Sequence, residues 1–532
     1  MFKQFMNCQH ARLASGAVNR RQFIRSIVAA GVAVPVAMQM ADTVLAATPK
    51  KGGHIKFGRG HGSTTDSLDP TTSENGYTVQ LNMSYANCLT EVNNEGVLVP
   101  ELAESVTSDD AQTWVFKLRR GVEFHNGKSL TPEDVIATIN LHRGDTKSAV
   151  KGLMAPIVDM RKDGKDTVVI SLDSKNADFP YLLSDYHLPI LPLDGDAINP
   201  VAGIGTGGYI LHHFDPGVKA EFTRNPNYWK PDSAHFDEVE LLALLDVAAR
   251  QNAVMNGEVD AIDRVDPKTV ALLQRALNLN ITEVTGTLHY TFPMRVDAAP
   301  FDNLDLRLAL KYSLNRQEMV DKILRGHGSR GNDHPISTAN RYHASDLPQR
   351  EFDPEQAAHY YRKSGHRGPI QLSTSDAAFA GAVDAAQLFK ATAAQAGIEI
   401  DVLREPKDGY WSNVWNKKPW CTCYWGGRAT EDWMFASAYV ADTEWNDTAW
   451  RTTPAAVEFN KLVVEARGEL DDNKRRALYA QCQKLIHDDG GAIVAMFANY
   501  IHAVDKKVAH TPSLAANWEF DGGKAAERWW FA

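Results

Sequence analysis

Residues 299–320 read APFDNLDLRLALKYSLNRQEMV, and this stretch holds the pattern that decides the fold class. Leucines at positions 306, 310 and 314 recur on one helical face, and Met319 and Ile323 continue the apolar stripe. We expect one amphipathic helix here, preceded by a strand and a loop in PMRVDAAPFDN, residues 293–303. A helix that follows a strand in this way is typical of α/β proteins.

The same succession recurs on both sides of this stretch. Downstream, FDPEQAAHYYRKSG (352–365) predicts a helix closed by glycine. AVDAAQLFKATAAQAGIEIDVLRE (382–405) predicts a helix, a stop at Gly397 and a strand. Upstream, ARQNAVMNGEVDAIDRV (249–265) predicts a helix that ends at Gly257 and gives way to a strand. Helices that alternate with strands indicate an α/β architecture.

Turn residues separate the predicted strands and helix in the N-terminal half. Trp114–Leu118 alternate as in a strand, and Asn126-Gly127 is a turn dipeptide. Thr131, followed by proline, predicts the start of a helix. GTGGYILHHFDPGVKAEFTRNPNYWKP (205–231) predicts a glycine loop and two strands joined by a turn at residues 215–217.

Chain length and net charge limit the number of lobes and the class of partner that we expect. A chain of 532 residues is expected to form two or three lobes. Its formal net charge is -10, and because the first 47 residues carry five Lys/Arg and one acid, the remaining chain carries -14. An acidic surface argues against nucleic acid or anionic lipid as the main partner.

Motifs for catalysis and metal binding are weak. The Gly-Lys-Ser of HNGKS (125–129) lacks the earlier glycine that a phosphate-binding loop needs, and turn chemistry explains it better. The chain has no Gly-x-Ser-x-Gly elbow and no His-Glu-x-x-His zinc motif. Cys421 and Cys423 are predicted to be buried strand residues rather than metal ligands. We therefore expect no enzyme, no metal and no cofactor, with a secreted hydrolase as the distant alternative.

The N-terminus indicates export. Arg20-Arg21 with Phe23, Ile24 and Arg25 resembles a twin-arginine signal, a short apolar stretch follows, and Ala46-Ala47 offers a cleavage site. We expect residues 1–47 to be a signal peptide that delivers a folded protein to the periplasm; a membrane anchor is the alternative. Folding before export, in a reducing cytoplasm, predicts free cysteines.

Five segments in order resemble one family. They are RRGVEFHNGKSLTPEDV (119–135), GTGGYILHHF with FTRNPNYW, ARQNAVMNGEVDAI, APFDNLDLRLALKYSLNRQEMV and FDPEQAA. From about residue 50 to its end, the chain resembles periplasmic solute-binding proteins of the dipeptide, oligopeptide and nickel class, family 5. These are the extracytoplasmic components of ABC importers.

The resemblance implies a two-lobed α/β periplasmic-binding-protein fold with a ligand cleft between the lobes and an extra subdomain in lobe one. Two crossings of the chain between the lobes, near Tyr290 and Ala498, would form the hinge. The implied divisions are lobe one at 48–288 with the subdomain near 82–200, lobe two at 289–499, and a return to lobe one at 500–532.

The segment CTCYWGGRATEDWMF (421–435) is the first candidate for the site. In peptide-binding relatives a tryptophan-led loop of lobe two carries an aspartate that pairs with the ligand's amino group. Here Trp425 holds the tryptophan place and Arg428 stands where those relatives have the aspartate. The usual amino-group contact is therefore in doubt, although Arg428 could also form an ordinary surface ion pair.

Other candidates follow from the same resemblance. Arg295 stands where the family commonly has asparagine, and two arginines suggest a ligand with a carboxylate. Glu431 or Asp432 could hold a cationic nitrogen, and Tyr77 and Asn75 are the candidates in lobe one. The structural alternatives are lobe packing for Arg295 and helix capping for Asp432.

These residues fit a zwitterion: a short peptide, an opine-like conjugate or another amino-acid derivative. The alternative ligands are a metal chelate, haem, or a quaternary amine held by some of the seven tryptophans between 411 and 450. The implied partners are an ABC permease and its ATPase, and the expected state is a monomer.

Overall fold

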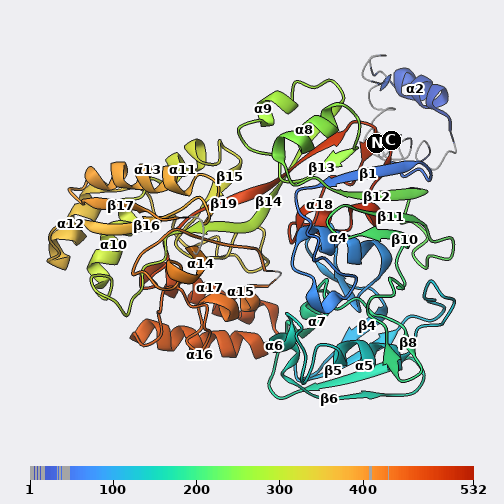
Figure 1. Cartoon of the computed structure of the whole chain (residues 1–532), viewed down its shortest axis with the longest axis horizontal. Helices are drawn as coiled ribbons and strands as arrows, with labels where there is room; N and C mark the ends of the chain where they lie inside the picture. The colour runs from blue at the N-terminus through green and yellow to red at the C-terminus, as the bar shows by residue number, and fades with distance from the viewer. Residues whose placement is uncertain are drawn as a thin grey trace.

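The chain folds into two α/β lobes joined by a pair of long antiparallel strands (Figure 1). The computed structural model describes residues 18–30, 48–406, 410–428 and 430–532, together with the isolated positions Phe5, Gln9, Arg12, Val32, Val34, Ala37 and Met38. The two-lobed α/β class expected from the sequence is confirmed. Where each lobe begins and ends along the chain stays a prediction.

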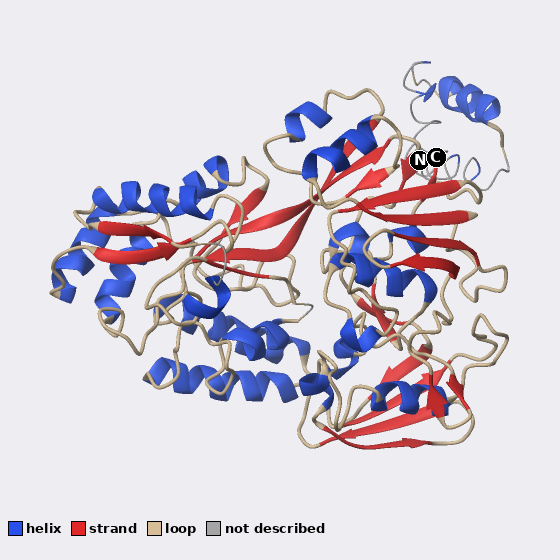
Figure 2. Ribbon diagram, viewed as in Figure 1, coloured by secondary structure: helices blue, strands red, loops and turns tan. Residues whose placement is uncertain are grey.

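The connecting strands are β14 (Leu279–Thr291) and β19 (Val494–Asp505). They pair from Leu279 opposite Asp505 to Thr291 opposite Val494, with a bulge between Thr285 and His289. Both run from one lobe into the other (Figure 2). They belong to a nine-stranded sheet in the order β10-β11-β12-β1-β13-β19-β14-β18, with β15 also on β19. The other strands are β1 (His54–Arg59), β10 (Tyr209–Asp215), β11 (Lys219–Arg224), β12 (Glu238–Ala243), β13 (Ala261–Ile262), β15 (Gly328–Arg330) and β18 (Cys423–Trp425).

Lobe one is built on the β1 side of this sheet and contains the C-terminal segment. Phe57 of β1 packs against Phe520 and Trp529, with ring centroids 5.1 and 6.2 Å apart. Helix α4 (Gly76–Tyr85) is buried along its whole length. The remaining elements are α8 (Val247–Met255), α9 (Val270–Leu273), β20 (Val508–Ala509), α18 (Glu519–Gly522), α19 (Ala525–Arg528) and β21 (Trp530–Phe531).

A second sheet, in the order β4-β5-β7-β6, forms a subdomain with its own apolar core. Helix α5 (Pro132–Asn140) packs on it, and its start confirms the prediction, because Thr131 and Asp134 form a capping box around a proline. The strands are β4 (Ala103–Thr107), β5 (Thr113–Leu118), β6 (Ile157–Lys162) and β7 (Thr167–Leu172). Short elements surround them: η1 (Pro70–Thr72), β2 (Thr90–Val92), β3 (Leu98–Pro100), α6 (Lys151–Met154), α7 (Phe179–Leu182), β8 (Leu193–Asp194) and β9 (Ala197–Ile198).

Lobe two is rich in helices around the parallel pair β16 (Ile370–Thr374) and β17 (Ile400–Arg404) (Figure 2). Its helices are α10 (Leu304–Tyr312), α11 (Arg316–Lys322), α12 (Pro354–Ser364), α13 (Ala382–Ala394), α14 (Tyr410–Asn413), α15 (Glu431–Ala438), α16 (Pro454–Gly468) and α17 (Asp472–Asp488). The stop of α12 at Gly365, with φ of 70°, confirms the expected glycine cap.

The predicted extent of one helix is wrong. The single helix expected over residues 306–323 is two helices, α10 and α11. Ser313 ends the first, and the Asn315 side chain accepts a hydrogen bond from Glu318 N at 3.1 Å, which caps the second. The apolar stripe survives because both helices bury their leucine and methionine face in one core. Periodicity alone did not reveal the break, since asparagine is also tolerated inside helices.

Near the N-terminus, α2 (Arg20–Ala29) begins after Asn19, which caps it together with Gln22. The expected cleavage site at Ala46-Ala47 lies outside the described residues. Among the described helices none is both long and apolar enough to cross a bilayer. Cys88, Cys421, Cys423 and Cys482 are free and buried; Cys423 lies in strand β18 as predicted, whereas Cys421 precedes that strand.

Candidate ligand-binding cleft

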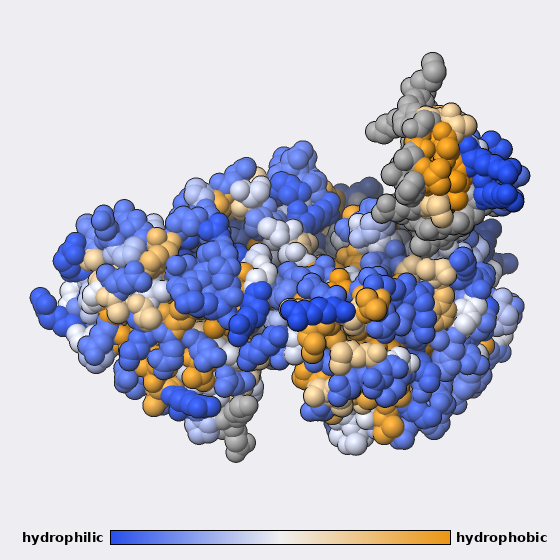
Figure 3. All heavy atoms as spheres, turned by 90° about the horizontal axis from the view of Figure 1, so that it is seen from above, coloured by the Kyte–Doolittle hydropathy of each residue, from blue (hydrophilic) through white to orange (hydrophobic). Residues whose placement is uncertain are grey.

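A cavity of about 420 Å³ lies between the lobes. Seen from above, the surface is mostly hydrophilic and is indented between the two lobes (Figure 3). The volume lies within the range of about 300–1,000 Å³ that is usual for small-molecule sites. Lobe one contributes Ser73, Glu74, Asp185, Tyr186, His187 and Trp518 among others, and lobe two contributes Gly427, Arg428, Trp433, Ser437 and Trp445.

Arg428 supplies the positive charge of the lobe-two wall. Its side chain donates only to uncharged oxygens: Gly426 O at 3.3 Å, Gly427 O at 3.1 Å and Ser437 Oγ at 3.4 Å. In the part of the chain that the structure describes, no carboxylate lies within 4.0 Å of the guanidinium. Burial lowers the pKa of Arg428, and the nearby Tyr186 and Asp185 oppose that shift. A half-buried guanidinium without a counter-charge is suited to hold an anionic group of a ligand.

Asp185 and His187 form a buried pair on the lobe-one wall. Asp185 Oδ1 accepts from His187 N at 2.9 Å and lies 2.5 Å from His187 Nδ1. His187 Nε2 lies 2.7 Å from the carbonyl oxygen of Ser73. Because both ring nitrogens face acceptors, both must donate, which requires the imidazolium form. Burial lowers the pKa of His187, but Asp185 and the Ser73 carbonyl outweigh it and raise the pKa above the ordinary value.

Aromatic side chains complete the cavity. Tyr186 and Trp518 meet edge to face with centroids 5.3 Å apart. From lobe two, Trp433 also packs against the core of the subdomain, and its ring lies 5.8 Å from the Arg428 guanidinium. Trp445 lies on the same wall. A ligand with charged ends and an apolar body fits such a lining.

Trp425, the first predicted aromatic, lies behind this wall rather than on it. It is 6% exposed, its Nε1 donates to Asp447 Oδ2 at 3.2 Å, and its ring lies 6.2 Å from Trp445. Burial raises the pKa of Asp447 to about 6. Trp425 therefore supports Trp445 and does not itself line the cavity.

Three further predicted residues lie elsewhere. Arg295 pairs with Asp297 at 2.7 Å and donates to the carbonyl oxygen of Asn416 at 2.9 Å, away from the cavity. Tyr77 is fully buried in α4. Asn75 caps that helix. None of the three lines either of the two cavities between the lobes that are described here.

Glu431 and Asp432 are bound within lobe two, close to the charge of Asp178 at a second contact between the lobes. Asp432 binds Arg467 Nε at 2.9 and 3.1 Å, and Glu431 accepts from Tyr342 N at 2.7 Å. Burial raises the pKa of Glu431 to about 7 and also raises that of Asp432. Neither lines the cavity.

This second meeting place, here named the α7–α17 contact, joins the subdomain to helices α16 and α17. Asp178 Oδ2, at the start of α7, lies 2.5 Å from Arg475 Nη2, and their side chains are 4% and 5% exposed. Ala177 N donates to Arg467 O at 2.6 Å. The contact is thus a buried ion pair reinforced by a main-chain hydrogen bond.

Another cavity, of about 690 Å³, also lies between the lobes beside the connecting strands. Tyr290 and Tyr500 line it, with Arg264 from lobe one and Lys322 from lobe two. None of the predicted site residues borders it.

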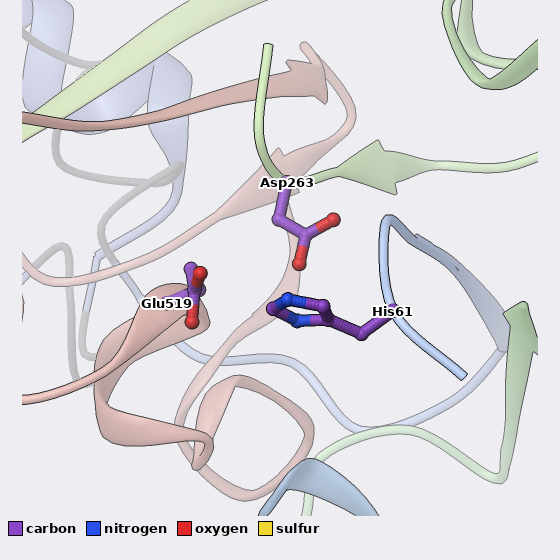
Figure 4. Close-up of side chains that lie close together, drawn as sticks. All are labelled: His61, Asp263 and Glu519. Carbon is purple, nitrogen blue, oxygen red and sulfur yellow. The ribbon is translucent and has the colours of Figure 1, made fainter. Parts of the chain in front are cut away.

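Among the residues that the structure describes, two groups of side chains have the composition of metal sites. His61, Asp263 and Glu519 gather from three distant segments (Figure 4), with potential ligand atoms within 4.8 Å of one another. However, Arg59 lies 3.3 Å from Asp263, and the Arg264 guanidinium contacts His61. Arginines on both sides already supply the positive charge.

The second group consists of Glu91, Glu101 and Glu527. Lys230 binds all three at 2.8–2.9 Å, and Lys524 adds a further bond to Glu91 at 2.6 Å. These carboxylates form a buried ion network that ties the C-terminal helix to lobe one.

Sequence reasoning missed the lobe-one side of the cavity. Asp185 and His187, in YLLSDYHLP (181–189), belong to no recognised motif. Only the fold brings them to the same cavity as Arg428. The aromatic side was partly visible, since Trp433 and Trp445 belong to the tryptophan group between residues 411 and 450.

Two lobes that enclose a cavity and are joined by two strands define the class of two-lobed ligand-binding proteins. The family model "Bacterial extracellular solute-binding proteins, family 5 Middle" matches residues 97–447. This chain belongs to family 5 of the bacterial extracellular solute-binding proteins.

The individual relatives have low sequence identity to this chain, but the matches cover most of both chains. The dipeptide-binding protein of Escherichia coli (strain K12) is 23% identical over 464 residues, which cover 77% of this chain and 83% of the relative. The periplasmic protein DppA from Helicobacter pylori, solved with the peptide STSA, superposes with a TM-score of 0.71 at 20% identity over 89% of this chain and 98% of that one. AgaA from A.tumefacien R10, solved with agropinic acid, gives 0.72 at 20% identity over 90% and 99%. These structures establish the fold.

Proposed function

We propose that this protein captures a short peptide or peptide-like zwitterion, such as an opine or another amino-acid derivative, for an ABC importer. It binds without catalysis: the ligand enters the cleft, the lobes close on it, and the closed complex delivers it to a permease driven by an ATPase. The protein acts as a monomer in the periplasm, to which a twin-arginine signal sends it. The family membership and the relatives that hold a peptide and agropinic acid support this proposal.

The observation that carries the proposal is Arg428 in the wall of the cavity. An acidic group of a ligand would accept hydrogen bonds from the Arg428 guanidinium and supply the negative charge that no described residue places beside it. The aromatic walls would enclose the apolar part of the same molecule. Closure then stabilises the complex because the ligand contacts both lobes only in the closed state.

Native mass spectrometry of the mature protein, purified from the compartment to which it is exported, tests the function. We expect a retained zwitterion that is released on denaturation and is lost from Arg428→Gln. Arg295→Gln is the matched control, because Arg295 pairs with Asp297 outside the cavity, and it should retain the ligand. A retained metal chelate or haem would contradict the proposal, as would a ligand that survives Arg428→Gln unchanged.

A further inference from the structure

The two walls of the 420 Å³ cavity carry opposite charges. Lobe two presents Arg428, which has no carboxylate partner among the described residues. Lobe one presents Asp185 and Glu74, with His187 as the cation bound to Asp185. The cavity is therefore dipolar, with its negative side on lobe one.

Asp185 is oriented by His187 and still offers one oxygen. Both contacts from His187 go to Oδ1, and no described residue donates a hydrogen bond to Oδ2. The residue is only 7% exposed, so bulk water has little access to it. Oδ2 is not one of the buried side-chain atoms that lack a partner among the described residues, so it keeps access to the cavity, where a ligand cation can bind it.

We propose that the ligand spans the cavity with its amino group on Asp185 of lobe one and its acidic group on Arg428 of lobe two. This orientation rests on the proposed function and deepens it, because it selects ligands that carry both charges. It reverses the arrangement implied by the peptide-binding relatives, in which an aspartate of lobe two takes the amino group.

The neighbouring side chains favour this orientation. Tyr186 and Trp518 line the cavity beside Asp185 on the lobe-one wall; Tyr186 packs on His187, and the partly buried Trp518 offers its ring to an ammonium group. Exposed Glu74 adds negative charge to the same wall. Because each end of the ligand belongs to a different lobe, only the closed protein satisfies both charges, which couples recognition to closure.

The test uses a panel of dipeptides, tripeptides and amino-acid conjugates, each free, N-acylated and C-amidated, in calorimetric titrations. For the members that bind, N-acylation should weaken binding to the wild type by about 10- to 100-fold. Asp185→Asn should weaken binding of the free form by a similar factor and leave the N-acylated form unchanged. Arg428→Gln should behave in the same way toward C-amidation.

Two features of these variants keep the test independent of folding. In Asp185→Asn the amide oxygen of the new side chain can still accept hydrogen bonds from His187 N and Nδ1, so these contacts are kept while the negative charge is lost. Glu74→Gln, an exposed change on the same wall, provides a second variant with a smaller effect on the free amine.

The outcomes separate the two proposals. If no panel member binds the wild type in any form, the proposed function is wrong. If members bind but Asp185→Asn and Glu74→Gln weaken the free and N-acylated forms equally, the function stands and the orientation is overturned.

Discussion

Two of the places where the lobes of this protein meet differ in how their charges are paired. At the α7–α17 contact, Asp178 and Arg475 lie 2.5 Å apart and are almost fully buried. At the cavity, Arg428 and Asp185 face the space between the lobes without pairing with each other. Buried charges are tolerated when they are matched, so the charges at the first place need no ligand. At the second place, Arg428 has no carboxylate partner among the described residues, and Asp185, which is paired with His187, keeps one oxygen for a ligand.

The largest effect is expected when the Asp178–Arg475 ion pair is removed. Asp178→Asn leaves Arg475 buried without a counter-charge, which costs on the order of 3–5 kcal/mol in buried pairs. Because the pair spans the lobes, the cost falls on the closed state, and the Kd of the retained ligand should rise by about 100-fold or more. Small-angle scattering should show a less compact complex at a fixed ligand concentration.

The control for this prediction is Asp472→Asn on the same helix as Arg475. Asp472 pairs with Arg341 at the surface, where both side chains are nearly half exposed, so the change should cost less than about 1 kcal/mol. Equal loss of affinity in the two variants would show that the α7–α17 contact does not hold the closed state.

The second prediction concerns pH at the same contact. Glu431, with its pKa raised to about 7, holds its proton more tightly in the folded protein than in the unfolded chain. Its contribution to the free energy of unfolding is full below about pH 4 and is lost as pH rises through about 7. Glu431→Gln, which can still accept from Tyr342 N, should therefore be more stable than the wild type by about 3 kcal/mol at pH 8.

Urea unfolding of both proteins at pH 5 and pH 8 measures this difference. At pH 5 the folded wild type holds the proton while the unfolded chain has largely lost it, so the two free energies of unfolding should differ by only about 1 kcal/mol. A constant difference at both pH values would mean that Glu431 does not ionise within this range.

The third prediction sharpens the contrast at Arg428. Arg428→Gln should weaken ligand binding by about 2 kcal/mol, since hydrogen bonds to charged groups contribute about 1.5–3 kcal/mol. The ligand-free protein should not lose stability, because the half-buried guanidinium has no carboxylate partner in the described residues. Thermal unfolding without and with ligand measures both quantities. A drop in ligand-free stability would reveal a structural role for Arg428.

The smallest expected effect concerns the loop that carries Arg428. A Cβ at Gly427 would lie 1.7 Å from Thr287 Oγ1 on strand β14, whereas a Cβ at Gly426 would meet nothing closer than 3.8 Å. Gly427→Ala should cost about 1–2 kcal/mol of unfolding free energy and displace the loop from the connecting strand. Gly426→Ala is the matched control and should have little effect. Equal unfolding free energies in urea for the two variants would contradict the close approach.

Local features of the sequence predicted most of the fold. The cap at Thr131, the glycine stops at Gly257 and Gly365, and the apolar stripe of residues 306–323 depend on neighbours in the chain. The break between α10 and α11 was missed because asparagine caps a helix only when the backbone before it has already turned.

The site was harder to predict because it is assembled from both lobes. Arg428 was found from the loop that holds it, and it does line the cavity. Glu431 and Asp432 are on the same segment, but Arg467 and Tyr342 engage them at the other contact. Asp185 could not be found, since its role depends on a fold that brings a loop of lobe one opposite Arg428.

A crystal structure of the protein with the ligand it retains during purification tests the central claim most directly. The account predicts density between the lobes with an acidic group within hydrogen-bond distance of Arg428, an amino group at Asp185 Oδ2, and an intact Asp178–Arg475 pair. A direct ion pair between Arg428 and Asp185, with the ligand bound elsewhere, would contradict the claim that the cavity reserves these charges for the ligand.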